Sequence, residues 1–335
     1  MAKIGVLGAG TWGTALAILL SENGNDVTLW AARGTKAKKF QEDREYKEGL
    51  PGVKFPESLQ IEESLENTCK EKDVIVFAVA SPYIRETARK ASSYIQKGTK
   101  IVDVSKGIEE QTLLTLCDIL EEELVGADVS ILSGPSHAEE VSKGIPTTVV
   151  IGSKSKETAQ YLQGLFMNET FRVYISSDII GIELGGSLKN VIALAAGVID
   201  GLGLGDNTKA ALITRGISEM SRLGIAMGGR SETFAGLSGI GDLIVTCTSK
   251  HSRNRNAGVL IGQGYSAKEA MEQVNQVVEG VHSAKAALKL SQKYNVDMPI
   301  VEQINLVLFE GKSAKEGLSD LFQRERRNEH DNMDW

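Results

Sequence analysis

The stretch that most constrains the fold lies at the N-terminus. Lys3–Gly8 reads K-I-G-V-L-G, a short apolar run that ends at glycine and predicts a buried strand. Gly8–Gly13 then reads G-A-G-T-W-G and leads into a helical pattern over 14–23, and Asp26–Trp30 predicts a second strand. A strand, G-x-G-x-x-G, a helix and a second strand within about 30 residues form the setting of a dinucleotide-binding fingerprint. A plain glycine turn between strand and helix is the alternative interpretation.

Each glycine of this motif has a physical role in binding a pyrophosphate. Gly8 allows the tight turn after the strand, Gly10 lets the backbone approach the phosphates, and Gly13 lets the helix pack closely on the strand. The helix that follows would offer unpaired N–H groups and a positive dipole end to the phosphate oxygens. The motif therefore predicts a dinucleotide cofactor.

The end of the second strand bears on which dinucleotide is bound. A site selective for NAD usually has an aspartate or glutamate there, which accepts a hydrogen bond from the ribose 2′-OH. This chain reads W-A-A-R-G-T-K, with no acid and with Arg33 close by. Arg33 is either a contact for the 2′-phosphate of NADP or a solvated loop arginine, and both interpretations stay open.

Buried strand patterns recur along the first half of the chain, over Asp73–Val79, Lys100–Ser105, Val129–Ser133, Thr147–Ile151 and Phe171–Ile175. Helical patterns alternate with many of them. Ser81 and Pro82 have the residue types of a helix start, an N-cap followed by proline. The alternation predicts an α/β domain with a Rossmann-type, doubly wound and mostly parallel sheet.

Polar residues follow two of these predicted strands. Lys106 comes after one strand, and Gly134 and Ser136 come after the next, in S-G-P-S-H-A. In a doubly wound sheet, ligands bind beyond the carboxyl ends of the strands. Lys106 is therefore a candidate functional residue, with an ordinary surface lysine as the alternative.

The character of the sequence changes after Ile175, where long helical patterns replace the strands. Helices are predicted over Ile182–Ile199, Thr208–Met227, Arg255–Gln263, Gly280–Tyr294 and Pro299–Phe309. The sequence S-A-K-E occurs at Ser266 and again at Ser313, and each has the residues of a capping box that starts a helix. We therefore expect an α/β domain over residues 1–177 and an all-α domain over residues 178–335.

Gly181–Asp200 is the most unusual helix of the second half. Its apolar residues go almost all the way round, which is typical of a helix buried in a core, yet Lys189 and Asn190 lie in its middle. Gly185 and Gly186 leave bare backbone beside Lys189, where a small ligand could lie. The alternative is a lysine that extends its ammonium group to the surface, with glycines that allow close helix packing.

Two loops between the predicted helices carry polar groups. Gly236–Thr248 reads G-L-S-G-I-G-D-L-I-V-T-C-T and places Asp242 among small and apolar residues. Ser252–Asn256 reads S-R-N-R-N, in which two arginines, interleaved amides and a serine suit the oxygens of a phosphate group. An exposed polar turn before a helix is the alternative interpretation of this segment.

Composition and charge argue against several classes of protein. The net charge of −7 argues against a general nucleic-acid or anionic-membrane binder, although a local basic pocket is compatible with it. Three widely spaced cysteines and four histidines show neither a disulfide framework nor zinc-ligand spacing, so we expect no metal. The N-terminus enters a strand directly, and no run of about 18 uncharged apolar residues occurs. We therefore expect no signal peptide, no membrane span and a cytoplasmic protein.

Five segments of the sequence resemble one enzyme family. They are G-S-L-K-N-V-I-A-L-A-A-G around Lys189, the N-terminal G-A-G-T-W-G, S-G-P-S-H-A, and G-D-L-I-V-T-C followed by S-R-N-R-N. They are similar to the bacterial NAD(P)-dependent glycerol-3-phosphate dehydrogenases, and the resemblance extends over essentially the whole chain. It implies a C-terminal domain like that of 6-phosphogluconate dehydrogenase. It also implies the reversible reduction of dihydroxyacetone phosphate to sn-glycerol 3-phosphate, which feeds glycerophospholipid synthesis.

The resemblance also implies roles for individual residues. Beside the motif glycines, the NADP(H) or NAD(H) cofactor would contact Thr11, Trp12, Arg33, Lys106, Ala138, Arg253, Val277 and Glu279. The substrate would be bound by Lys106, Gly134, Ser136, Lys189, Asp242, Ser252, Arg253 and Asn254. Lys189 would be the proton acceptor. This chain departs from the family at Ala32, where a polar side chain often contacts the adenosine ribose.

The chemistry of the implied reaction explains why these residue types are needed. Reduction of a ketone creates an alkoxide, and an ammonium group beside it stabilises the charge and donates the proton. Burial and the second cation Lys106 would lower the pKa of Lys189, whereas Asp242 would raise it and hold the lysine in place. Asn190 and Thr246 are expected to be further hydrogen-bond partners. Since the two lysines lie in different predicted domains, we expect the site in the cleft between them.

Two alternative functions stay open from the sequence. A β-hydroxyacid or 6-phosphogluconate-type dehydrogenase also joins a Rossmann domain to helices that carry a buried lysine, but S-R-N-R-N argues against it. A non-catalytic dinucleotide-sensing module would bind the cofactor without turnover and has no use for Lys189. Whichever function holds, exposed apolar helix faces would favour a homodimer. The expected partner is a small phosphorylated molecule and not a nucleic acid.

Overall fold

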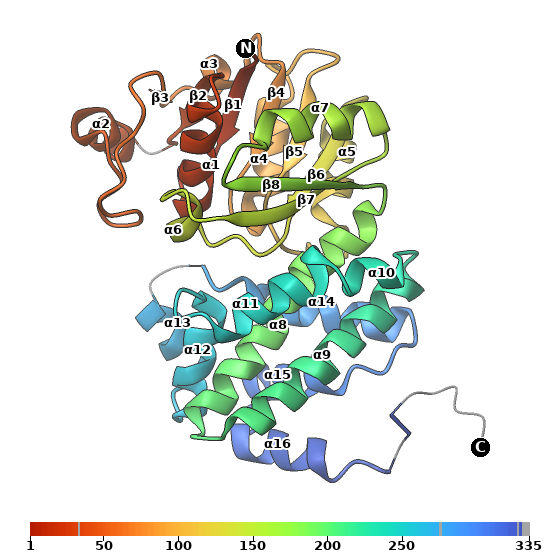
Figure 1. Cartoon of the computed structure of the whole chain (residues 1–335). Coiled ribbons are helices and arrows are strands. Elements are labelled where there is room, and N and C mark those ends of the chain that lie inside the picture. Colours follow the sequence, from red (N-terminus) through yellow and green to blue (C-terminus); the bar gives the residue numbers. More distant parts are fainter. Residues whose placement is uncertain (33, 275–276, 327, 330–335) are drawn as a thin grey trace.

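The computed structural model describes residues 1–32, 34–274, 277–326 and 328–329, and among these eight strands form one sheet (Figure 1). The strand order is β3-β2-β1-β4-β5-β6-β7-β8, and every neighbouring pair is parallel except β6 and β7. The strands are β1 (Lys3–Leu7), β2 (Asp26–Trp30), β3 (Gln60–Glu62), β4 (Val74–Phe77), β5 (Lys100–Asp103), β6 (Asp128–Ser133), β7 (Thr147–Ser153) and β8 (Phe171–Ser176). The predicted α/β sheet is confirmed.

Helices cover both faces of this sheet. Successive side chains of a strand point to opposite faces, and in the central strands the side chains on both faces are apolar. Val6 packs in one core cluster with Leu16, and its neighbour Leu7 packs in another with Ile84. The helices of this part are α1 (Thr11–Glu22), α2 (Gly34–Asp43), α3 (Leu65–Cys69), α4 (Ile84–Ala91), α5 (Leu116–Glu123), α6 (Ala138–Val141) and α7 (Lys156–Phe166).

The second half of the chain is helical and lies on the side of the sheet where β1, β4 and β5 end (Figure 1). Its helices are α8 (Ile179–Gly201), α9 (Asp206–Ala226), α10 (Ser231–Phe234), α11 (Asp242–Thr248), α12 (Arg253–Gly262), α13 (Ala267–Val274), α14 (Glu279–Lys293), α15 (Pro299–Phe309) and α16 (Ala314–Phe322). Reciprocal hydrogen bonds confirm both capping boxes, between Ser266 and Glu269 and between Ser313 and Glu316.

Helix α8 is the axis of the helical half. Every residue of 181–199 is buried, and the other helices surround it. Among the described residues it is the one helix long and apolar enough to cross a membrane by length and composition, but 89% of that window is buried inside the protein. Its apolar surface is therefore explained by the protein core.

Glycines bring α12 into close contact with α8. A Cβ atom at Gly258 would collide with the carbonyl oxygen of Leu194, and one at Gly197 would collide with the carbonyl oxygen of Arg255. Both helices thus need bare backbone at the contact, since a methyl group would force them apart. This packing fixes the N-terminal end of α12, which carries S-R-N-R-N, relative to Lys189.

Several local predictions were wrong. The edge strand β3 was not predicted, and Gly236–Thr248, predicted to be a loop, contains a short helical turn (Leu237–Gly241) and α11, which begins at Asp242. The cap of the short helix at 81–83 is Ala80. The hydroxyl of Ser81 does not cap it and bonds to Glu279 of α14, because the helical half of the chain lies within its reach.

Candidate active site

A cavity of about 1250 Å³ lies between the sheet half and the helical half. The sheet half contributes the loop after β1 with Gly10 and the loop after β5 with Lys106. The helical half contributes Lys189 and the start of α12 with Arg253. The expected cleft therefore exists. Predicted site residues in its lining are Gly10, Thr11, Trp12, Lys106, Ser136, Ala138, Lys189, Asn190, Thr246, Ser252, Arg253, Asn254, Val277 and Glu279.

Two lysines share one carboxylate at the inner end of the cavity. The Nζ atom of Lys189 lies 2.5 Å from Oδ1 of Asp242, and the Nζ atom of Lys106 lies 2.5 Å from Oδ2 of the same side chain. Lys189 is only 6% exposed, so it does not extend its ammonium group to the surface. The two lysines come from α8 and from the loop after β5, so Asp242 joins the two halves of the chain at this point.

Burial and the neighbouring charges shift the pKa values of Lys189 and Asp242. Burial lowers the pKa of Lys189 to about 7, and Lys106 adds to this effect while Asp242 opposes it. Burial alone would raise the pKa of Asp242, but the two ammonium groups hold it below its usual range. Lys189 can therefore gain and lose a proton near neutral pH, beside an anion that stays ionised.

Of the two expected hydrogen-bond partners of Lys189, Thr246 bonds to it and Asn190 does not. The ammonium group of Lys189 donates to Oγ1 of Thr246 over 2.7 Å, as expected. Asn190 was also expected to bond to Lys189, but its Oδ1 accepts from Nδ2 of Asn254 over 2.9 Å instead. Consecutive residues of a helix point about 100° apart, so Asn190 faces α12 and not the ammonium group. It positions Asn254.

The glycines below Lys189 do not form an open patch. A Cβ atom at Gly185 would collide with the carbonyl oxygen of Ser238, and one at Gly186 would lie 3.1 Å from Oγ of Ser133 and 3.5 Å from Cγ of Lys106. The expectation that a ligand lies on this patch is therefore wrong, because neighbouring protein segments fill it. Gly186 allows the stem of Lys106 to pass close to α8 and reach Asp242, and Gly185 allows the close approach of Ser238.

S-R-N-R-N is the start of helix α12. Ser252 is its N-cap and accepts from the backbone N–H of Arg255 over 3.2 Å. The two arginines have different surroundings. Arg255 bonds to Asp200 over 2.6 Å, whereas Arg253 is exposed, lines the cavity and has no ion pair with any other described residue. Of the two arginines expected to suit a phosphate, only Arg253 is thus available for one.

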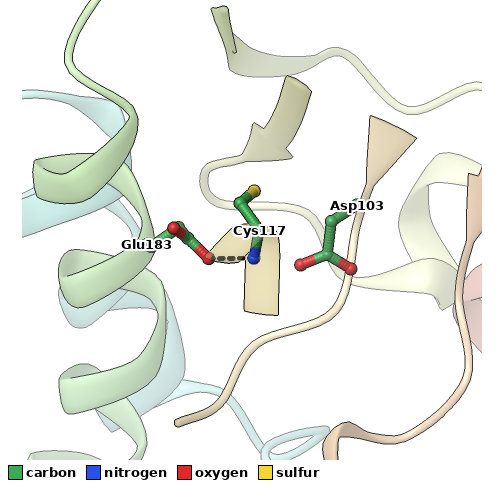
Figure 2. A group of neighbouring side chains, drawn as sticks. All are labelled: Asp103, Cys117 and Glu183. Carbon is green, nitrogen blue, oxygen red and sulfur yellow. Dashed lines mark hydrogen bonds between the residues drawn. The ribbon is translucent and has the colours of Figure 1, made fainter. Parts of the chain in front are cut away.

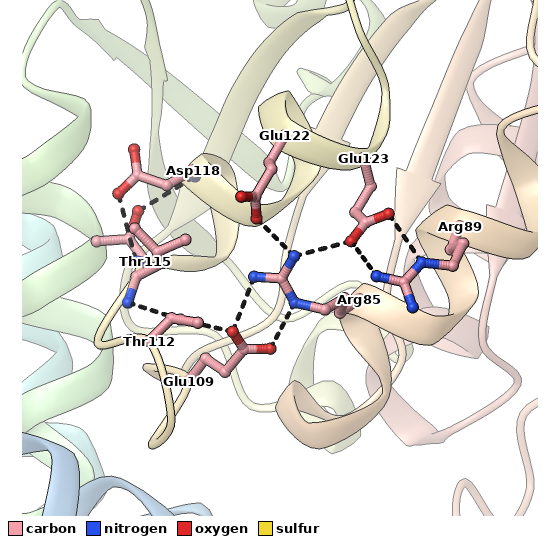
Figure 3. A network of polar contacts seen from close by, with 9 residues as sticks. Arg85, Arg89, Glu109, Thr112, Thr115, Asp118, Glu122 and Glu123 are labelled. Atoms are coloured by element: carbon pink, nitrogen blue, oxygen red, sulfur yellow. Dashed lines mark hydrogen bonds and ion pairs between the residues drawn. The ribbon is translucent and has the colours of Figure 1, made fainter.

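The loop that carries Lys106 is held on both sides. Lys106 also donates to the carbonyl oxygen of Gly134 over 3.2 Å, and Ser136 donates to the same oxygen over 3.0 Å. Farther along, Arg85 of α4 makes two bonds of 2.8 Å to Glu109 and also contacts Glu122 and Glu123 of α5 (Figure 3). This network fixes the segment after Lys106 to the sheet half.

The motif glycines form the cradle that a dinucleotide requires. Gly8 has φ +124°, a conformation that other residues rarely adopt, and a Cβ atom at Gly13 would collide with the carbonyl oxygen of Gly8. A Cβ atom at Gly10 would stand in open space. Gly10 is also the N-cap of α1 and lacks a side-chain cap, so the first N–H groups of α1 are free for an anion. These residues fit a pyrophosphate.

The other predicted cofactor residues are spread around this cradle. Thr11 and Trp12 begin α1, Ala138 begins α6, and Val277 and Glu279 approach from the helical half. Arg33 lies outside the described residues. The sequence did not point to one carboxylate that lies beside the following residue, Gly34: an oxygen of Glu63, after β3, lies 2.9 Å from the point where a Cβ atom of Gly34 would stand.

One buried group of side chains has the composition of a metal site. Asp103, Cys117 and Glu183 have ligand atoms within 4.8 Å of one another, at the junction of the sheet and α8 (Figure 2). Burial raises the pKa of Asp103 and of Cys117 well above their usual values, and raises the pKa of Glu183 to about 7. A metal ion would have to displace the protons that these raised pKa values favour, and Glu183 already accepts from the backbone N–H of Cys117 over 2.9 Å. We therefore assign no metal to this cluster.

Two histidines in the cavity lining were not predicted. The ring centroids of His137, after β6, and His251, before α12, lie 5.8 Å apart across the cleft. Burial and the nearby Lys189 lower the pKa of His137, which favours a neutral ring. Only the position of His137 inside S-G-P-S-H-A could have pointed to it, because nothing in the sequence brings the two histidines together.

Comparisons with known proteins agree with this geometry. Residues 3–159 match the family model described as the NAD-dependent glycerol-3-phosphate dehydrogenase N-terminus, and residues 178–319 match the corresponding C-terminus. The chain is 55% identical over 335 residues to a glycerol-3-phosphate dehydrogenase (NAD(P)+) of Agathobacter rectalis, covering 100% of both chains. It is 50% identical to that of Bacillus subtilis, covering 99% of this chain and 97% of the relative.

A solved structure is similar over the whole molecule. The crystal structure of glycerol-3-phosphate dehydrogenase from Coxiella burnetii has a TM-score of 0.93 and 36% identity, and the match covers 96% of this chain and 99% of that one. A ketopantoate reductase from Ralstonia eutropha shares only the fold, with 15% identity and a TM-score of 0.61. Two family models that together span nearly the whole chain, and relatives at least half identical over their full length, show that the chain belongs to the NAD-dependent glycerol-3-phosphate dehydrogenase family.

Proposed function

We propose that this protein catalyses the reversible, NAD(P)H-dependent reduction of dihydroxyacetone phosphate to sn-glycerol 3-phosphate, and so supplies glycerophospholipid synthesis. The observation that carries the proposal is the pair Lys189 and Lys106 on the two oxygens of Asp242. This pair lies in the same cavity as the dinucleotide cradle at Gly10. The names of the relatives, glycerol-3-phosphate dehydrogenase (NAD(P)+), support the substrate and the cofactor.

Lys189 would manage the proton of this reaction. Hydride transfer at the carbonyl carbon is the chemistry that a nicotinamide cofactor, held at Gly8, Gly10 and Gly13, would supply. As the carbonyl oxygen gains negative charge, the ammonium group of Lys189 donates a proton to it, and in the reverse direction the neutral amine removes that proton. The pKa of about 7 suits both directions. Lys106 would stabilise the developing charge as a second cation, and Asp242 and Thr246 would keep Lys189 in one orientation.

The start of α12 would bind the substrate phosphate. Arg253 is a cation that lines the cavity, and Asn254 beside it is fixed by bonds to Asn190 and to the N–H of Gly280. Ser252 lies at the N-terminal end of the same helix, where N–H groups attract anions. Gly134 and Ser136 would close the substrate pocket from the sheet half, next to Lys106.

The cofactor would lie across the carboxyl ends of β1 and β4. Its pyrophosphate would rest on Gly8, Gly10 and Gly13 and on the free N–H groups of α1. The remaining contacts proposed from the family are Thr11, Trp12, Arg33, Lys106, Ala138, Arg253, Val277 and Glu279.

A substrate panel with cofactor absorbance as readout tests the function. Purified protein should oxidise NADPH or NADH with dihydroxyacetone phosphate, and 2-keto and 3-keto acids should react at least about 100-fold more slowly in kcat/KM, because they offer no phosphate. Faster turnover of a keto acid would favour a β-hydroxyacid or 6-phosphogluconate-type dehydrogenase. Cofactor binding without turnover of any substrate would favour a sensing module.

We also propose a homodimer in a reducing, cytoplasmic compartment. Ile225, Phe309 and Phe322 of the helical half are 50%, 41% and 73% exposed, so a second copy could cover them. Cys69, Cys117 and Cys247 are free and buried, which agrees with a reducing compartment. Light scattering behind a sizing column should give twice the chain mass, and a monomer at micromolar concentration would contradict the dimer.

A further inference from the structure

Ser81 joins the two halves of the chain beside the cavity. It follows β4, and its hydroxyl donates to Oε2 of Glu279 at the start of α14 over 2.5 Å. Its backbone N–H donates to Oε1 of the same carboxylate over 3.2 Å. Glu279 lines the cavity, as do Val79 and Ala80 just before Ser81. Ser81 therefore holds a carboxylate of the helical half against the loop that borders the cofactor cradle.

The backbone around Ser81 leaves no freedom for this contact. A Cβ atom at Gly107 would lie 2.6 Å from Oγ of Ser81 and 3.7 Å from Oε2 of Glu279, so only glycine fits there. Gly107 comes directly after Lys106, and its carbonyl oxygen accepts from Oγ of Ser187 of α8 over 3.0 Å. Ser81 is thus packed between the segment that carries Lys106 and the helix that follows Glu279.

A chain of hydrogen bonds continues from Glu279 to the other end of the site. The next residue, Gly280, donates its N–H to Oδ1 of Asn254 over 2.8 Å, and Asn254 donates to Asn190 over 2.9 Å. A Cβ atom at Gly280 would lie 2.5 Å from the carbonyl oxygen of Asn190, so α14 begins in direct contact with α8. The position of Glu279 is therefore coupled to Asn254, which neighbours Arg253.

From this arrangement we propose that Ser81 is a positioning residue: it fixes the Glu279 carboxylate at the cofactor pocket and, through the start of α14, holds Asn254 in place for the substrate phosphate. The inference rests on the proposed function for its substrate part only. Hydrogen bonds to a carboxylate are the stronger kind, so loss of the hydroxyl should have a measurable effect on binding. Ser81 itself lies behind Glu279 and does not line the cavity.

The test measures cofactor dissociation constants by fluorescence titration of NADPH and NADH, without substrate or turnover. Ser81→Ala should weaken cofactor binding on the order of 10-fold, the usual effect of losing a hydrogen bond to a charged group. Ser81→Cys, which keeps a weak S–H donor in a slightly larger side chain, should bind the cofactor with an affinity between those of the wild type and Ser81→Ala. Ser92→Ala is the matched control, since the hydroxyl of Ser92 bonds to the carbonyl oxygen of Arg89 on the exposed side of α4. It should bind like the wild type.

A double-mutant cycle separates positioning from general damage. If Ser81 acts through Glu279, Ser81→Ala should raise the cofactor dissociation constant by less than about twofold when Glu279 has already been replaced by alanine. Wild-type cofactor affinity in Ser81→Ala, or the same loss in both backgrounds, would overturn the proposal. In steady state, Ser81→Ala should raise KM for dihydroxyacetone phosphate several-fold with kcat nearly unchanged. The titrations need no substrate, so they decide the role of Ser81 even if the proposed reaction is wrong.

Discussion

The ammonium nitrogen of Lys189 lies 2.5 Å from Oδ1 of Asp242, and both side chains are almost completely buried. Burial and the second cation Lys106 lower the pKa of Lys189, whereas the anion Asp242 raises it. Because burial is the largest of these effects, the pKa falls to about 7, within the range in which an enzyme can use both the acid and the base. The rates in the two directions should therefore depend on pH in opposite ways.

The pH prediction follows from the sign of that shift. In the proposed mechanism ketone reduction needs protonated Lys189, so its kcat should be level below pH 7 and fall above it. Alcohol oxidation would need the neutral amine, so its kcat should rise through the same range. Asp242→Asn removes the anion that raises the pKa of Lys189, so the midpoint should move to lower pH by about one unit or more. Full pH profiles of kcat in both directions check this. A midpoint that moves upward in Asp242→Asn, or the same slope in both directions, would exclude Lys189 as the titrating group.

The phosphate prediction uses the two arginines of S-R-N-R-N as a matched pair. Arg253→Ala should lower kcat/KM for dihydroxyacetone phosphate by about 30-fold, the equivalent of about 2 kcal/mol, chiefly through KM. Dihydroxyacetone without phosphate should be a poor substrate whose rate hardly changes. Arg255→Ala, which breaks the bond to Asp200, should lower the melting temperature without changing the preference for the phosphorylated substrate. Equal losses for both substrates in Arg253→Ala would refute the anchor.

The cofactor prediction concerns the end of β2. In the proposed role, Arg33 would offer charge-assisted hydrogen bonds to a 2′-phosphate, so NADPH should be preferred over NADH by roughly 5- to 30-fold in kcat/KM. Arg33→Asp should reverse this order. Glu63, near Gly34, should oppose the 2′-phosphate, so Glu63→Gln should increase the preference for NADPH. Kinetics with both cofactors decide the matter, and a wild type that prefers NADH would contradict it.

A stability prediction tests the packing that places α12. Gly258→Ala puts a methyl group against the carbonyl oxygen of Leu194, so it should lower the free energy of unfolding by about 1–3 kcal/mol. Gly164→Ala in α7 is the control, because a Cβ atom there meets nothing within 4 Å. It should stabilise the protein by up to about 1 kcal/mol through helix propensity. Urea unfolding of both variants measures this, and equal effects would show that α8 and α12 tolerate a wider separation.

Local patterns predicted most of the fold. The predicted bounds of β2 and α15 coincide with the observed ones, because an apolar run and a proline at the first helical turn are local signals. β3 was missed because it has three residues, of which only Ile61 is buried. Asp242 was assigned to a loop because glycines precede it, but packing against α8 makes it the first residue of α11.

The sequence predicted which residues form the site more accurately than it predicted which of them contact one another. The motifs identified Lys189, Lys106 and Asp242, and the structure brings them together. Asn190 was assigned to Lys189 by its position in the sequence, but the geometry of the helix directs it to Asn254. The contact between Ser81 and Glu279 joins residues 198 positions apart, so no local pattern could have revealed it.

The most direct test of the role of Lys189 is the turnover of Lys189→Ala with dihydroxyacetone phosphate and NADPH, measured together with the dissociation constant for NADPH. We predict a loss of kcat of about 10²–10⁴-fold, typical of a missing general acid, with cofactor affinity close to that of the wild type. A variant that keeps more than about a tenth of the wild-type kcat would contradict the role of Lys189 as the proton donor.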